Sequence, residues 1–146
     1  MPSVREQIIA AFFSELKTLE SSRIKVLRNP DKLMKVPADG AIIILRDGES
    51  GDPEVLLSPL TYIYEHLVTA EIMVQNPDPA IRDSTLDALL VSIGGVINAN
   101  RTLDGLAEWI EARSPDFQEE SIEGAASIRT ATVLIMVRFF TTDPLN

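Results

Sequence analysis

The sequence predicts an α+β fold in which a mostly antiparallel mixed sheet with long strands packs against two main helices. Two segments repeat apolar residues at helical spacing, and two others are rich in β-forming residues over an unusual length. The chain has 146 residues, of which 45% are hydrophobic, and this suits a single buried core. Residues 1–146 are therefore expected to form one domain.

Both predicted helices carry start signals. Ser3 and Glu6 form a capping box before a helix expected from about Val4 to Leu19. Asp78 is placed to cap a second helix, expected from about Pro79 to Asn98, because proline is favoured at the first helical position.

The segments between the two predicted helices favour strands. Ile24–Leu27 is a short candidate, while Ala41–Arg46, an acidic stretch and Val55–Leu57 are typical of a hairpin with a long acidic tip. From Leu60 to Val74, apolar and aromatic side chains and His66 fill the even positions. Since strands usually have about five or six residues, this run predicts a long bent strand that serves more than one partner.

The C-terminal third is expected to add one more long strand. Thr102–Glu111 favours a helical turn that leads into a strand, Ser114–Gly124 an acidic loop, and Ala126–Phe140 the strand itself. The order α, three β, α, β predicts a mostly antiparallel sheet. Long strands expose unpaired edges, which oligomerisation would cover.

Composition excludes several classes of protein. Without cysteine there is no disulfide or thiolate metal site, and the absence of a signal sequence predicts folding in the cytoplasm. No apolar run approaches the roughly 20 residues of a membrane-spanning helix. The net charge of -9, without a basic stripe, indicates a protein that repels DNA rather than holding it.

The sequence predicts neither a catalytic site nor a cofactor or metal site. Gly94 and Gly95 lie within a helical pattern and lack the Lys and Ser or Thr of a phosphate loop. His66, the only histidine, has no evident acid–base partner and is expected to be structural. Trp109, the only tryptophan, is expected inside the core.

Three long segments resemble the tail terminator, or tail completion, proteins of long-tailed phages and gene transfer agents. They are Ser58–Gln75 (SPLTYIYEHLVTAEIMVQ), Thr102–Phe117 (TLDGLAEWIEARSPDF) and Gly124–Asn146 (GAASIRTATVLIMVRFFTTDPLN). The resemblance implies a homohexameric ring that caps the finished tail tube and stops its polymerisation. It also implies a joint to the head connector and a channel for DNA.

The resemblance names the expected partners: further copies of the chain, the major tail tube protein and the head–tail connector protein. DNA would pass without sequence-specific binding, and the protein would be cytoplasmic during assembly and later part of the particle's tail. Candidate subunit or tube contacts are charged residues of the acidic stretch and the last strand, which can pair across strands or subunits. They are Asp47, Glu49, Asp52, Glu54, Arg129 and Arg138.

Three other functions stay open at this point. A head–tail connector or stopper component would occupy the other side of the same joint. A small acidic binding module would act as a monomer on a basic partner, and its binding would be sensitive to salt. A small metal-dependent or acid–base enzyme would use the Asp47–Glu54 segment and His66.

Overall fold

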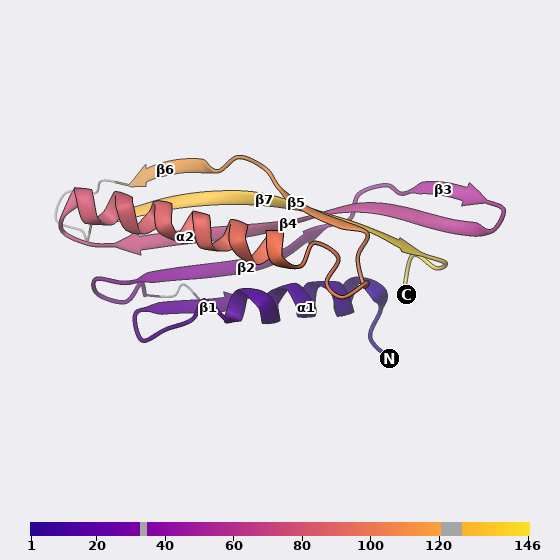
Figure 1. Cartoon of the computed structure of the whole chain (residues 1–146), viewed down its shortest axis with the longest axis horizontal. Helices are drawn as coiled ribbons and strands as arrows, with labels where there is room; N and C mark the ends of the chain where they lie inside the picture. The colour runs from indigo at the N-terminus through magenta and orange to yellow at the C-terminus, as the bar shows by residue number, and fades with distance from the viewer. Residues whose placement is uncertain (33–34, 121–126) are drawn as a thin grey trace.

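The computed structural model describes residues 1–32, 35–120 and 127–146, and it confirms the predicted α+β fold. Within these residues two helices pack against one seven-stranded, mostly antiparallel mixed sheet (Figure 1). The elements are α1 (Val4–Lys17), β1 (Ile24–Arg28), β2 (Ala41–Glu49), β3 (Glu54–Leu57), β4 (Leu60–Gln75), α2 (Pro79–Ala99), β5 (Trp109–Ala112), β6 (Asp116–Glu120) and β7 (Ile128–Thr141).

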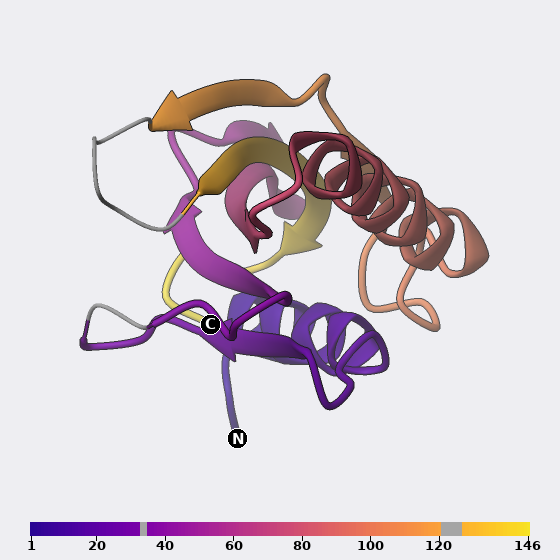
Figure 2. The ribbon, with the colours of Figure 1, turned by 90° about the vertical axis from the view of Figure 1, so that its left-hand side faces the viewer.

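Both helices begin where the capping signals predict. The Ser3 hydroxyl accepts a hydrogen bond from the Glu6 backbone N–H at 3.2 Å, and Asp78 accepts one from Ala80 at 2.9 Å. The helices lie on the same face of the sheet (Figure 2). In the described part of the chain, neither helix is long and apolar enough to cross a membrane.

The long strand β4 organises the sheet. It pairs with β7 along fourteen residue pairs, from Tyr62 opposite Thr141 to Gln75 opposite Ile128. On its other side, β2 occupies one half of β4 and β3 the other. The prediction of a strand with more than one partner is therefore confirmed.

The predicted hairpin between Ala41–Arg46 and Val55–Leu57 is wrong in its pairing. The two strands do not pair with each other; β3 instead pairs with the start of β4, with Leu57 opposite Leu60. The chain leaves β2 through an irregularity in the β2–β4 register between Arg46 and Glu49. The acidic stretch therefore passes along one edge of β4 and does not form a hairpin tip.

Two expectations for the C-terminal third also need correction. The predicted acidic loop Ser114–Gly124 contains a strand, β6, which pairs with the first part of β7 because β5 covers only its middle. Residues 121–126 lie outside the described residues. Before β5, the segment expected to be a helical turn places Leu103, Asp104 and Gly105 at positive φ, which a right-handed helix does not allow.

The core lies between the helices and the even-numbered face of β4. Residues from both helices and five strands form one continuous apolar cluster. Its largest fully buried members include Phe12, Leu16, Ile72, Leu86 and Ile135. The period-two pattern and the two helical stripes predict this core, because all three present their apolar faces to one another.

Candidate assembly surface

A two-stranded arm extends from the body of the protein. It consists of β3 and the first residues of β4, from Glu54 to Ile63, and it reaches beyond the ends of both helices (Figure 1). The end of β7 runs along its inner strand, with Tyr62 opposite Thr141 and Ile63 opposite Phe140. Within the described residues, β3 has β4 as its strand partner on one side only.

The arm exposes four large apolar side chains, and all of them except that of Leu56 lie on one face. Their exposed fractions lie between 44% and 80%, with Leu57 the most exposed, and they are Val55, Leu56, Leu57 and Leu60. Alternation along the strands puts Leu60 on the same face as the core residue Tyr64. The apolar face of the sheet thus continues past the helices that cover it elsewhere, and such an exposed patch is typical of an interaction site.

Charged residues surround the base of the arm. Glu49, Asp52 and Glu54 are exposed on the segment that links β2 to β3. Arg138 of β7 lies with Asp52 and Glu54 around a hollow of about 390 Å³, and it contacts Glu65 and Glu108 at 3.2 Å each. The structure therefore brings one predicted interface arginine to the predicted acidic residues.

The other two predicted contact residues are engaged inside the protein. Arg129 lies nine positions away from Arg138 in β7 and pairs with Asp83 of α2 at 2.6 Å. Asp47 pairs with Arg28 at 2.9 Å, and the same guanidinium also holds Glu6. The hydrogen bonds from Arg28 are the main cause of the lowered pKa of both the Asp47 and the Glu6 carboxyl groups.

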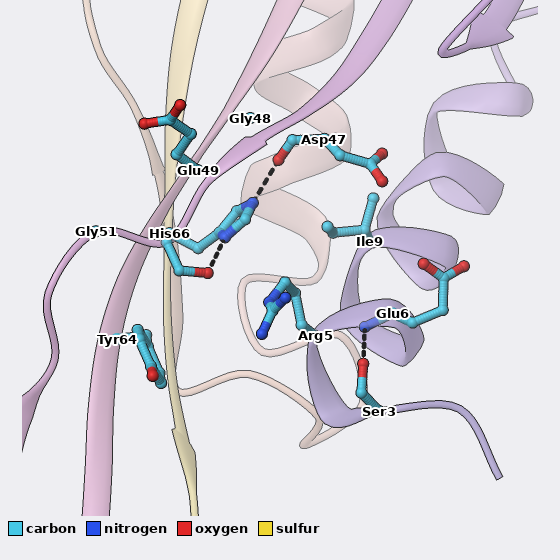
Figure 3. A pocket seen from close by; sticks show the side chains of 11 residues that line it. Ser3, Arg5, Glu6, Ile9, Asp47, Gly48, Glu49, Gly51, Tyr64 and His66 are labelled. Carbon is cyan, nitrogen blue, oxygen red and sulfur yellow. Dashed lines mark hydrogen bonds between the residues drawn. The ribbon is translucent and has the colours of Figure 1, made fainter. Parts of the chain in front are cut away.

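His66 fixes the chain where it leaves β2. Its ring is only 2% exposed, and Nε2 donates a hydrogen bond to the Asp47 backbone carbonyl (Figure 3). Because a carbonyl can only accept, Nε2 carries the proton, and Nδ1 accepts a hydrogen bond from the Ser50 hydroxyl at 2.6 Å. One side chain in β4 thus holds both ends of the irregular turn.

The contact between Ser50 and His66 has the elements of a nucleophile and its base. Catalytic pairs of this kind orient the histidine with a third group, and in serine hydrolases a buried carboxylate also stabilises the imidazolium. Here the third group is a neutral carbonyl of Asp47, and burial lowers the pKa of His66. This geometry favours a structural role for His66, which holds the loop in place.

A polar cavity of about 470 Å³ lies beside His66. It is lined by the start of α1, including Arg5 and Glu6, by the end of β2, and by Tyr64 (Figure 3). Arg5 is tied to the C-terminal segment through a hydrogen bond to the Pro144 carbonyl at 3.0 Å. Among the described residues, no group of three or more His, Asp and Glu side chains is placed to hold a metal ion.

The burial of His66 predicts that stability depends on pH. Desolvation is the main cause of its lowered pKa, so between the folded value and the unfolded value of 6.5 only the unfolded chain binds a proton. The free energy of unfolding should therefore fall as the pH is lowered through 6.5, with a limiting slope of about 1.4 kcal/mol per pH unit between the unfolded and the folded pKa. Urea unfolding at a series of pH values measures this slope.

The matched variant is His66→Gln, whose amide can make both hydrogen bonds without titrating. Because the chain has one histidine, this variant should have a nearly flat profile between pH 5 and 7.5. A slope that persists in the variant would assign the pH dependence to other groups. The carboxyl groups of Glu6 and Asp47, whose pKa values are lowered, contribute their own loss only at lower pH.

Comparison with known protein families and curated proteins finds no relative of this chain. No family model matches the chain, and no curated protein matches its sequence. Function is therefore inferred from the residues themselves.

Sequence reasoning missed the apolar members of the arm. The sequence predicts Val55, Leu56 and Leu57 as the second strand of a hairpin and does not indicate that all of β3 is exposed. One signal was available: three consecutive apolar residues do not alternate, so at least one must face solvent or a partner. Trp109, expected in the core, is 43% exposed at the other edge of the sheet, beneath the guanidinium of Arg101 at 4.7 Å.

Proposed function

We propose that this protein is a structural assembly protein that forms a six-membered ring on the end of a phage-like tail tube. The ring stops polymerisation of the tube and provides the joint to the head connector, while DNA passes through its channel. Its partners are other copies of the chain, the major tail tube protein and the connector protein. It acts in the cytoplasm during assembly and afterwards as part of the particle, and it has no catalytic role.

The observation that supports this proposal best is the exposed apolar arm. A side chain such as Leu57, at 80% exposure, contributes nothing to the core, and leaving several together in water is unfavourable unless a partner covers them. The inner strand of the arm continues into the longest ladder of the sheet, which begins at Tyr62, so the arm presents these side chains on a rigid element. An assembly protein that acts by shape requires such a surface.

The proposal predicts that the arm is needed to stop tube growth. Tube protein from the same source would be polymerised with and without this chain, and tube lengths would be measured by electron microscopy. The natural chain should shorten the tubes and bind their ends. Leu57→Asp with Leu60→Asp should weaken end binding by at least about 100-fold, because burial of each leucine is worth about 1.5–3 kcal/mol.

The matched control is Val91→Asp, at a position 69% exposed on α2 and remote from the arm. It should stop tube growth as the natural chain does. Tubes of unchanged length in the presence of the natural chain, together with binding to the connector protein alone, would contradict the proposal. That result would assign the chain to the connector side of the joint.

A further inference from the structure

Charge is distributed unevenly along the chain. Residues 1–46 contain eight Lys and Arg against five Asp and Glu, whereas residues 47–146 contain five against seventeen. The first part therefore carries a net charge of +3 and the second -12, and all four lysines lie in the first part. The overall acidity of the protein conceals a basic region.

The fold places the two charge types at opposite edges of the sheet. The basic edge comprises exposed cations on and around β1, namely Arg23, Lys25, Lys32 and Lys35, which outnumber the two exposed carboxylates of the same segment, Asp31 and Asp39. The acidic edge comprises Glu111 of β5 and Asp116 of β6, which are also exposed, and one exposed cation, Arg113, lies between them in the chain. β1 forms one outer border of the sheet, and β5 and β6 together form the other (Figure 2). Within the described residues, no member of either edge takes part in an ion pair.

The cations of the basic edge are too far from the carboxylates of the acidic edge to pair with them within one molecule. The sheet order puts four strand spacings between β1 and β6, or roughly 19 Å, and the Debye length at physiological salt is about 8 Å. Strand pairing nevertheless aligns Lys25 closely with Asp116. The row of paired residues that crosses the sheet from Lys25 ends at Gln118 of β6, and Asp116 lies two residues from Gln118 on the same face. A second copy beside the first would bring Lys25 and Asp116 together.

Backbone groups on the outer sides of β1 and β5 are partly occupied already. On the outer side of β1, Val26 N–H donates to the Glu20 carboxylate and the Val26 carbonyl accepts from Lys17, each at 3.0 Å. On β5, the Ile110 carbonyl accepts from Arg101 at 2.6 Å. Because these groups are already used, a further strand cannot simply be added at either position.

We propose that the basic edge of one copy binds the acidic edge of the next, in a head-to-tail contact made by side chains. Trp109 lies two residues from Glu111 on the same face and is half exposed, so it provides an aromatic anchor beside the charges. Such a contact repeats from copy to copy and either closes into a ring or grows into a filament. That the contact closes into a ring rests on the proposed function. The inference itself specifies which two surfaces of neighbouring copies meet.

Charge reversal tests the contact in the full-length chain. One variant reverses the basic edge, Lys25→Glu with Lys32→Glu, and another reverses the acidic edge, Glu111→Lys with Asp116→Lys. Sedimentation velocity over a range of concentrations would measure association, and emission of the single tryptophan would report burial of its edge. The natural chain should associate, with a blue shift of emission, and added salt should weaken it.

Each variant alone should associate at least about tenfold more weakly, because like charges then face each other. An equimolar mixture of the two should associate as the natural chain does, since each reversed edge then meets an edge of opposite charge. Recovery in the mixture also shows that both variants are folded. The control Asp87→Lys, at an exposed position on α2, should leave association unchanged.

Three outcomes would overturn the inference: a natural chain that stays monomeric at the highest concentration, reversals without effect, or a mixture that fails to recover. The same variants in the tube-growth assay separate this inference from the proposed function. Normal capping by both variants would overturn the contact and leave the proposed function standing. If the chain associates in a charge-dependent way but never caps tubes, the contact stands and the proposed function is overturned.

Discussion

Gly48→Ala is expected to lower the free energy of unfolding by about 3 kcal/mol or more, which is a large share of the stability of a domain. Gly48 has φ of +67°, and an added Cβ would lie 1.8 Å from the carbonyl oxygen of Leu67. That atom belongs to the backbone of β4, so the strands themselves must separate. The irregular turn at the end of β2 would be lost, and with it the pairing of Glu49 with Leu67.

The chain contains a close control for this prediction. Gly51 has a similar φ of +64°, but nothing lies within 4 Å of its added Cβ. Gly51→Ala should therefore cost only about 1–2 kcal/mol, from the strained backbone conformation alone. Urea unfolding of both variants measures the difference, and equal losses would show that close approach to β4 does not constrain position 48.

Phe12→Ala is expected to lower the free energy of unfolding by about 3–5 kcal/mol. Phe12 is 1% exposed on the inner face of α1 and belongs to the cluster shared by both helices and the sheet. Its removal leaves a cavity that the surrounding strands, fixed by their ladders, cannot fill. Thermal and urea unfolding measure the loss.

The neighbouring phenylalanine is the control. Phe13 is only partly buried, and the Lys17 ammonium lies 5.7 Å from its ring centroid. Phe13→Ala should therefore cost at most about 2 kcal/mol. If the two variants lost equal stability, the helix would be packed through a different face from the one described.

Local signals in the sequence were sufficient for the elements that depend on neighbours along the chain. The Ser3 and Asp78 caps predict the starts of both helices, because each cap acts on residues two or three positions away. The period-two run predicts β4 to within one residue at its end. An over-long strand also predicts more than one partner, since no single strand of ordinary length covers it.

Pairing between distant segments could not be predicted in the same way. Both β2 and Val55–Leu57 read as strands, but alternation along a strand does not say which strand lies beside it. The choice depends on the turn at Gly48, whose close approach to Leu67 appears only in three dimensions. The contact of Ser50 with His66 was missed for the same reason: it joins residues sixteen positions apart through the irregular segment.

The candidate surfaces were predicted in part. Charge composition indicated the acidic residues at the base of the arm and two arginines. The ion pair that occupies Asp47 follows from the pairing of β1 with β2, and the one that occupies Arg129 from the packing of α2 on β7. The basic edge was not predicted, because a net charge of -9 averages over both parts of the chain. Only the sheet order and the strand register place Lys25 and Asp116 at opposite edges of the sheet.

The ladder between β4 and β7 also has a mechanical consequence. Its fourteen residue pairs run from the arm to the opposite end of the sheet. A force that pulls the arm along the strand direction acts in shear on this ladder, because inter-strand hydrogen bonds lie perpendicular to the strands. Many bonds must then break together instead of opening one after another as in unzipping. The arm is thus built to resist axial tension much better than a force that peels β3 away sideways.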